Sequence, residues 1–294
     1  MNILVLGGTY FIGKVLVELL VGKHTVATLN RGTREPSENV SLIVADRRNY
    51  SEVEEGLRGR NFDVVIDLSG YNKDDVAIVL DSLDGRFEHY IFCSSIAVCS
   101  QPPVCWPITE DHLKCSSVIE SEYGYNKWLA EQCLSLYSQK NNLPISVVRP
   151  VYVYGPYDQS GRIDYFFERI SEGRPIIMSG TGENIVQFGY VYDLCKAIVA
   201  IIGNEAAYGQ TFNISGRELV TISQFIDLVS LVIAMEVDVR FNVNNQEEVS
   251  ALTSKHRFAD IGKAEKVLGI IPETSLTEGI KTTYEWWMLT RRRK

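Results

Sequence analysis

Short apolar runs alternate with longer segments of mixed polarity throughout the first half of the chain. These runs predict buried strands over residues 3–6, 26–29, 42–45, 63–68, 89–93 and 145–148. Residues 11–20 place their apolar side chains on one helical stripe, and residues 120–139 predict a long helix. Strands separated by helices imply right-handed crossovers. We therefore predict an α/β fold with a doubly wound parallel sheet covered on both faces.

The pattern changes after Pro150, where frequent glycines divide the chain into shorter pieces. Helical periodicity returns over residues 163–171, 192–202, 223–235 and 277–289. We predict a nucleotide-binding domain over residues 1–150 and a smaller C-terminal α/β lobe over residues 151–294, with some later segments returning to the main sheet. The smaller lobe is the expected place for substrate binding.

Composition excludes several classes of function. The 294 residues include 29 Lys and Arg against 37 Asp and Glu, a net charge of −8, so nucleic acid is not an expected partner. No apolar run approaches the roughly 20 residues that a membrane span needs. The six cysteines show neither a CxxC pair nor a zinc-ligand spacing, so we expect no metal site. With no secretory-type start, we expect a cytoplasmic protein with reduced thiols.

A glycine-rich segment, Gly-Gly-Thr-Tyr-Phe-Ile-Gly, lies between the first predicted strand and the first predicted helix. Glycines at this position let the backbone approach a pyrophosphate, which the helix N-terminus attracts. We predict that this segment binds a dinucleotide through Gly7, Thr9, Tyr10, Phe11, Ile12 and Gly13. A tight strand–helix turn without a ligand is the alternative.

The end of the second predicted strand indicates which dinucleotide is bound. An acidic residue there would bind the ribose hydroxyls of NAD, but the chain has Asn30 and Arg31. Since no carboxylate would repel a 2′-phosphate and arginine binds phosphate well, we predict that NADP is preferred over NAD. A solvated loop with incidental arginines is the alternative. Asp46, after the third strand, is a candidate for the adenine amino group or for capping the next turn.

Tyr123 and Lys127 are separated by four positions in the long predicted helix and therefore lie on one helix face. An ammonium beside a phenol favours the phenolate, so we expect a lowered pKa for Tyr123 and a role in acid–base chemistry. The competing phenol, Tyr125, has Leu129 at the corresponding position. Ser94 and Ser95 end the fifth strand, at the edge where open parallel sheets bind ligands. Either hydroxyl is a candidate to hold the reacting oxygen.

In this order, these segments resemble the extended short-chain dehydrogenases/reductases, a Rossmann-fold superfamily, and most closely their NAD-dependent epimerase/dehydratase branch. The resemblance also includes Asp67-Leu68-Ser69-Gly70, Arg149-Pro150-Val151-Tyr152 and Phe212-Asn213-Ile214-Ser215-Gly216. It implies Tyr123 as the catalytic acid/base, Ser95 as the catalytic serine and Lys127 as the ligand of the nicotinamide ribose. It also implies cofactor contacts from Leu68, Ser69, Pro150 and Val153.

Three departures from this family bear on the substrate. Tyr10 stands where a glycine is usual. Gln187 replaces an arginine that commonly holds the substrate diphosphate, and it is our candidate substrate contact with Ser95 and Tyr123. Arg162, Arg169 and Arg174 are the candidate replacements for that arginine. The Ser94–Ser95 position also lacks the Thr-Asp-Glu sequence of sugar 4,6-dehydratases.

We therefore predict an NAD(P)-dependent oxidoreductase or epimerase that transfers hydride at a carbinol or ketone carbon of a sugar-nucleotide-like substrate. One alternative is an NADPH-dependent ketone reductase acting on a non-nucleotide small molecule. Another is a cofactor-bearing RNA- or protein-binding relative with vestigial catalysis, since the glycine segment followed by Asn-Arg-Gly also resembles a branch with chloroplast RNA-binding members. A homodimer through the helix of Tyr123, with Trp128 at the interface, is a further expectation.

Overall fold

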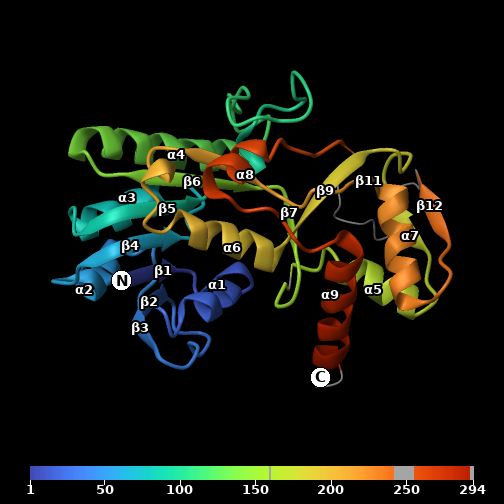
Figure 1. Cartoon of the computed structure of the whole chain (residues 1–294), viewed down its shortest axis with the longest axis horizontal. Coiled ribbons are helices and arrows are strands. Elements are labelled where there is room, and N and C mark those ends of the chain that lie inside the picture. The colour runs from blue at the N-terminus through green and yellow to red at the C-terminus, as the bar shows by residue number, and fades with distance from the viewer. Residues whose placement is uncertain (159, 242–254, 292–294) are drawn as a thin grey trace.

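A computed structural model describes residues 1–158, 160–241 and 255–291. Its centre is a seven-stranded sheet in the order β10-β6-β5-β4-β1-β2-β3, and every neighbouring pair is parallel (Figure 1). The strands are β1 (Asn2–Leu6), β2 (Thr25–Asn30), β3 (Val40–Val44), β4 (Phe62–Asp67), β5 (Phe87–Cys93), β6 (Ile145–Pro150) and β10 (Thr211–Ile214). This confirms the predicted doubly wound α/β fold.

Helices cover both faces of this sheet because its strands are apolar on both sides. In β1, Ile3 and Val5 face one core, whereas Leu4 and Leu6 face the other. The first core is covered by α1 (Ile12–Leu20), α6 (Val191–Ile201) and α8 (Gly262–Leu268). The second is covered by α2 (Tyr50–Leu57), α3 (Lys73–Leu83) and α4 (Glu122–Asn141).

A second lobe lies at the side of the sheet away from α2 and α3 (Figure 1). Its strands are β7 (Tyr152–Tyr154), β8 (Ile176–Met178), β9 (Ile185–Tyr190), β11 (Leu219–Thr221) and β12 (Val239–Phe241), and its helices are α5 (Asp164–Ser171), α7 (Ile222–Ile233) and α9 (Leu276–Arg291). Aromatic packing forms its core: the rings of Phe188 and Phe225 stack with centroids 4.4 Å apart. Among the described residues, no helix has both the length and the apolarity needed to cross a membrane.

The topology brings the candidate residues to one edge of the sheet. From β1 the chain builds outward to β3 on one side and to β10 on the other, which leaves a crevice at the carboxyl ends of β1 and β4. Helix α4 begins after Ser121, whose hydroxyl accepts a hydrogen bond from the Gly124 amide. A Cβ at Gly124 would lie 2.0 Å from the Ala97 carbonyl oxygen, so only glycine lets this helix pack so closely against the segment after β5 that carries the serines.

The predicted elements differ from the observed ones mainly at their ends. The predicted helix over residues 120–139 starts at Glu122 because Ser121 acts as its cap. The helix expected over residues 223–235 ends at Ile233, since Ala234 adopts a left-handed conformation (φ 60°).

Candidate active site

The glycine turn lies between two cavities. Gly7 has a φ of 88°, which an L side chain rarely adopts, and it leads directly from β1 into the turn. A Cβ at Gly13 would lie 2.0 Å from the Gly7 carbonyl oxygen, so α1 packs against the turn only with glycine there. Within the part of the chain that the structure describes, no side chain caps α1, whose N-terminus follows Tyr10 and Phe11. Because Tyr10 lines both cavities, the turn forms their shared wall.

We call the first space the arginine cavity; it has a volume of about 630 Å³ and contains Arg31, Arg34, Arg47 and Arg48 in its lining. Gly7, Thr9, Tyr10, Asn30, Asp46 and Ser69 also line it. Asn30 accepts a hydrogen bond from the Gly32 amide (3.0 Å), which shapes the loop after β2. The guanidinium of Arg34 lies over the Tyr10 ring, 4.6 Å from its centroid. Arg31 forms no ion pair with any residue in the described parts of the chain.

The structure places Asp46 in an ion pair rather than leaving its carboxylate open. Arg48 Nη2 lies 2.8 Å from Asp46 Oδ2, and hydrogen bonds from Arg48 lower the pKa of Asp46 to about 2. Asp46 also accepts a hydrogen bond from the Arg48 amide (3.0 Å), so it shapes the start of the next turn. Of the two predictions for Asp46, the contact with the next turn is therefore present. Asp46 also lines the arginine cavity.

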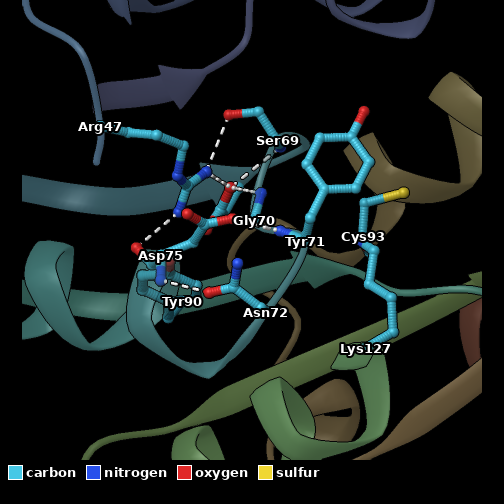
Figure 2. Close-up of polar contacts among 10 residues, drawn as sticks. Arg47, Ser69, Gly70, Tyr71, Asn72, Asp75, Tyr90, Cys93 and Lys127 are labelled. Carbon is cyan, nitrogen blue, oxygen red and sulfur yellow. Dashed lines mark hydrogen bonds and ion pairs between the residues drawn. The ribbon is translucent and has the colours of Figure 1, made fainter. Parts of the chain in front are cut away.

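Arg47 is the component of this cavity that the sequence analysis missed. Its guanidinium forms a two-pronged pair with the buried Asp67 carboxylate, with Nη1–Oδ1 and Nη2–Oδ2 distances of 2.6 and 2.9 Å. It also donates to Ser69 Oγ (2.8 Å) and to the Asp75 carbonyl oxygen (2.8 Å), as Figure 2 shows. Burial alone would raise the pKa of Asp67, but Arg47 holds it below its usual value. The only signal in the sequence was an aspartate ending an apolar strand, which predicts a buried partner.

We call the second space the tyrosine cavity; it has a volume of about 570 Å³ and is lined by Tyr10, Tyr71, Tyr123 and Tyr152. Ser95, Tyr123 and Lys127 all line it, together with the predicted cofactor contacts Phe11, Ile12, Leu68, Pro150 and Val153. The residues that the sequence analysis drew from five separate segments thus meet in one cavity beside the glycine turn. Ser69, in contrast, opens onto the arginine cavity.

The protonation of Tyr123 differs from the sequence-based expectation. Burial raises the pKa of its phenol to about 12, a hydrogen bond with Ser95 opposes this shift, and nearby Arg162 opposes it as well. The expected lowering by Lys127 was wrong for this structure. The Lys127 ammonium is directed away, toward the Cys93 carbonyl oxygen, to which it donates at 2.7 Å.

Ser94 and Ser95 have different surroundings, which separates the two candidates. Ser95 lies close to Tyr123, and its Oγ accepts a hydrogen bond from the Ala97 amide at 3.1 Å. Ser94 is 2% exposed, and its Oγ has no hydrogen-bond partner within the described residues. Ser95 is therefore the serine that faces the phenol.

Gln187 does not line either cavity. It is 3% exposed, its Nε2 donates to the Gly216 carbonyl oxygen (2.7 Å) and its Oε1 accepts from the Ala259 amide (2.9 Å). It thereby fastens the segment that carries Arg257 alongside β9. Of the three arginines considered as replacements, only Arg162 lines the tyrosine cavity.

Arg257 is a second cavity residue that the sequence analysis missed. Its guanidinium lies over the Tyr152 ring at 5.6 Å, and its Nε is buried with no partner among the described residues. Arg169 instead donates to the Pro175 carbonyl oxygen, and Arg174 pairs with Glu172. A lone arginine ahead of Phe258 gave no periodic or motif signal. Within the described ranges, His, Cys, Asp and Glu form no cluster suited to a metal ion.

Comparison with known proteins identifies the family. The sequence profile of the NAD dependent epimerase/dehydratase family matches residues 3–215. The chloroplast stem-loop binding protein of 41 kDa b from Arabidopsis thaliana is 30% identical, over 96% of this chain and 78% of its own length. A putative UDP-glucose 4-epimerase from Methanocaldococcus jannaschii is 24% identical, over 97% of each chain.

Solved structures agree with the fold. UDP-glucose 4-epimerase from Thermotoga maritima, solved with UDP-glucose, superposes with a TM-score of 0.86 at 23% identity, covering 99% of this chain and 100% of that one. UDP-glucuronic acid 4-epimerase from Bacillus cereus, solved with UDP-glucuronic acid and NAD, gives 0.83 at 21% identity, with 99% and 100% covered. The profile spans most of the chain, and the predicted resemblance is confirmed: the chain belongs to the NAD-dependent epimerase/dehydratase family of enzymes.

Proposed function

We propose that the chain transfers hydride at a carbinol or ketone carbon of a sugar-nucleotide-like substrate, as an epimerase or oxidoreductase. One observation supports this most strongly: Ser95, Tyr123 and Lys127 line a single cavity next to the glycine turn. In this proposal Tyr123 is the acid/base, Ser95 holds the reacting oxygen and Lys127 binds the nicotinamide ribose.

The arrangement fits a dinucleotide that spans both cavities. The glycine turn separates them, so a pyrophosphate lying on the turn would direct adenosine into the arginine cavity and nicotinamide into the tyrosine cavity. The nicotinamide cofactor supplies hydride acceptance and donation when bound. Lys127 has two ammonium protons beyond the one donated to Cys93, which suits a ribose with two hydroxyl groups.

Proton transfer at the substrate oxygen is the task of Tyr123. With a pKa of about 12, its phenol is protonated at neutral pH and is ready to donate to a carbonyl oxygen. In the opposite direction the phenolate form of Tyr123 accepts the carbinol proton, and the positive charge of Arg162 favours this deprotonated form. Ser95 donates a hydrogen bond to the same oxygen and fixes its distance from the phenol.

Two arginines support an anionic, nucleotide-linked substrate. Arg162 and Arg257 both line the tyrosine cavity, and neither forms an ion pair within the described residues. A diphosphate satisfies two guanidinium groups well, since charge-assisted hydrogen bonds to phosphate are among the strongest available. We propose that these arginines take the place of the arginine that Gln187 replaces, and that the second lobe is the main substrate-binding part.

The test is a panel of nucleotide sugars incubated with the wild-type protein and with Ser95→Ala. We expect a C4 epimer or a keto product from at least one nucleotide sugar, and a loss of roughly 100-fold in turnover for Ser95→Ala. Turnover of simple ketones alone, with NADPH consumed stoichiometrically, would instead identify a reductase of non-nucleotide substrates. No turnover of either class would reject the proposal.

We also propose that NADP is preferred over NAD. Asn30 ends β2 in place of a carboxylate, and Arg31 and Arg34 line the cavity beside it. Titration with NADPH and NADH tests this. Arg31→Ala is expected to lower the preference for NADPH about tenfold by removing a charge-assisted phosphate contact. The exposed Arg60→Ala, outside the cavity, should leave it unchanged; equal binding of both dinucleotides by the wild type would contradict the preference.

Stem-loop binding is the second candidate function, favoured by the similarity to the Arabidopsis thaliana protein. The net charge of −8 opposes it, since RNA affinity depends on clustered cations. A gel-shift titration with structured RNA at low and high salt decides between them. A salt-dependent shift at micromolar protein, together with no turnover of nucleotide sugars, would favour RNA binding over catalysis.

A further inference from the structure

Tyr71 stands where the two cavities meet. It follows β4 and precedes α3, and it lines both the arginine cavity and the tyrosine cavity. Its side chain is 58% exposed, although its ring centroid lies only 6.3 Å from that of Tyr123. An exposed aromatic ring inside the cleft has surface available for a ligand.

The backbone beneath Tyr71 is fixed by buried polar contacts. The Asp67 carboxylate accepts hydrogen bonds from the Ser69 and Gly70 amides at 3.0 and 2.9 Å while it pairs with Arg47. The Tyr71 amide donates to Asp75 Oδ2 at 2.8 Å (Figure 2). The backbone of the loop that carries the ring is therefore held by buried polar contacts.

The ring of Tyr71 also faces the ammonium of Lys127. Lys127 Nζ is 5.3 Å from the Tyr71 ring centroid and 4.7 Å from that of the fully buried Phe92. Lys127 is only 2% exposed, and both Lys127 and Tyr71 line the tyrosine cavity, so a ribose that reaches the ammonium from this cavity lies near the Tyr71 ring. A ribose bound to Lys127 would therefore lie close to the Tyr71 ring, next to Tyr123.

We propose that Tyr71 is a cofactor-positioning residue whose ring forms the wall of the nicotinamide-ribose site. This inference rests on the proposed function, because it uses the assignment of Lys127 to the nicotinamide ribose. The ring supplies the contact and its hydroxyl is not required. Because the ring contacts the nicotinamide riboside in this proposal, we expect its removal to weaken ligands that carry this part more than ligands that lack it.

The experiment compares whole dinucleotides with their adenosine halves. Calorimetric titration of wild type, Tyr71→Ala and Tyr71→Phe would use NADPH against 2′,5′-ADP and NADH against ADP. We expect Tyr71→Ala to weaken dinucleotide binding about tenfold and to leave the adenosine-half ligands within twofold. Tyr71→Phe should retain wild-type affinity for both. Tyr50→Ala, which removes a similarly exposed tyrosine from α2, is the matched control.

Each other result overturns the inference. An unchanged dinucleotide affinity in Tyr71→Ala would show that the ring makes no contact, and tighter binding would show that it obstructs the site. Equal weakening of both ligand sizes would indicate a general loss of loop structure. A wild type that binds adenosine-half ligands but gains nothing from the nicotinamide riboside would reject the proposed function itself, independently of the variants.

Discussion

His89 shows how burial alone fixes the charge of a side chain. It lies on β5 with 1% exposure, and desolvation lowers its pKa to about 4. Ser146 donates its own proton to the Ala207 carbonyl oxygen, so its oxygen accepts from His89 Nε2 at 2.9 Å. Nδ1 has no partner within the described residues, and a proton placed there would be buried without an acceptor.

His89 should therefore make the free energy of unfolding decrease as the pH is lowered. Between pH 6.5 and pH 4 the unfolded histidine binds a proton that the folded one does not, so acidification favours unfolding. Lowering the pH from 7 to 5 should cost about 2 kcal/mol of unfolding free energy through this residue. Urea denaturation of wild type and His89→Gln at both pH values measures it. Equal losses in the two proteins would contradict the account.

The site residues that the sequence predicted each lie within one element or motif, whereas those that it did not predict come from separate elements. Tyr123 and Lys127 share a helix, so their spacing alone predicts that they are neighbours. Arg47 and Asp67 lie on separate elements, and Arg257 enters the cavity from a segment paired with β9. Their roles depend on which elements become adjacent, and no local pattern encodes that. The pKa of Tyr123 was mispredicted because its sign depends on burial, which spacing does not reveal.

At the scale of elements, the Arg47–Asp67 pair joins the loop after β3 to the end of β4 and to the start of α3. Removing one partner of a buried pair leaves the other charge, and the groups bonded to it, without compensation. Asp67 would keep hydrogen bonds from Tyr90 and the loop amides but lose Arg47, the only cation at hydrogen-bond distance from it among the residues that the structure describes. The loop that carries Tyr71 would loosen with it.

We expect Arg47→Met to lower the unfolding free energy by about 3 kcal/mol or more, since the pair is buried and engaged at both ends. Arg48→Met is the matched control, because the adjacent Arg48–Asp46 pair is exposed and should leave the denaturation midpoint unchanged. Chemical denaturation of both variants at neutral pH checks this. A similar midpoint for the two would contradict a structural role for the buried pair.

Hydrophobic periodicity was sufficient to predict the main sheet, because buried parallel strands form continuous apolar runs and amphipathic helices repeat their apolar residues every three to four positions. Element ends were predicted less well: the start of α4 is set by the Ser121 cap and the end of α7 by the left-handed Ala234. The second lobe was predicted as an α/β unit, but only its helices were given residue ranges. Its short strands pair with partners far along the chain, as β12 does with β8.

At the scale of the molecule, the sheet topology assembles the site. β1, β4 and β5 end at one edge, and α4 packs against α3 and β6 beside them. The second lobe adds Tyr152, Arg162 and Arg257 to the lining of the tyrosine cavity. Trp128 on α4 packs against a core cluster, and the ammonium of Lys114 lies 5.9 Å from its ring centroid. This packing favours a core role for Trp128. A homodimer through the helix of Tyr123 stays a prediction, and light scattering tests it.

The most direct test of the account removes the hydroxyl group of Tyr123. Tyr123→Phe should abolish turnover of a nucleotide sugar, by about a thousandfold or more, while dinucleotide affinity stays nearly unchanged because Lys127 holds the ribose. Tyr125→Phe, two positions along the same helix, should retain activity. Measured under single-turnover conditions, unchanged activity of Tyr123→Phe would contradict the assignment of Tyr123 as the acid/base.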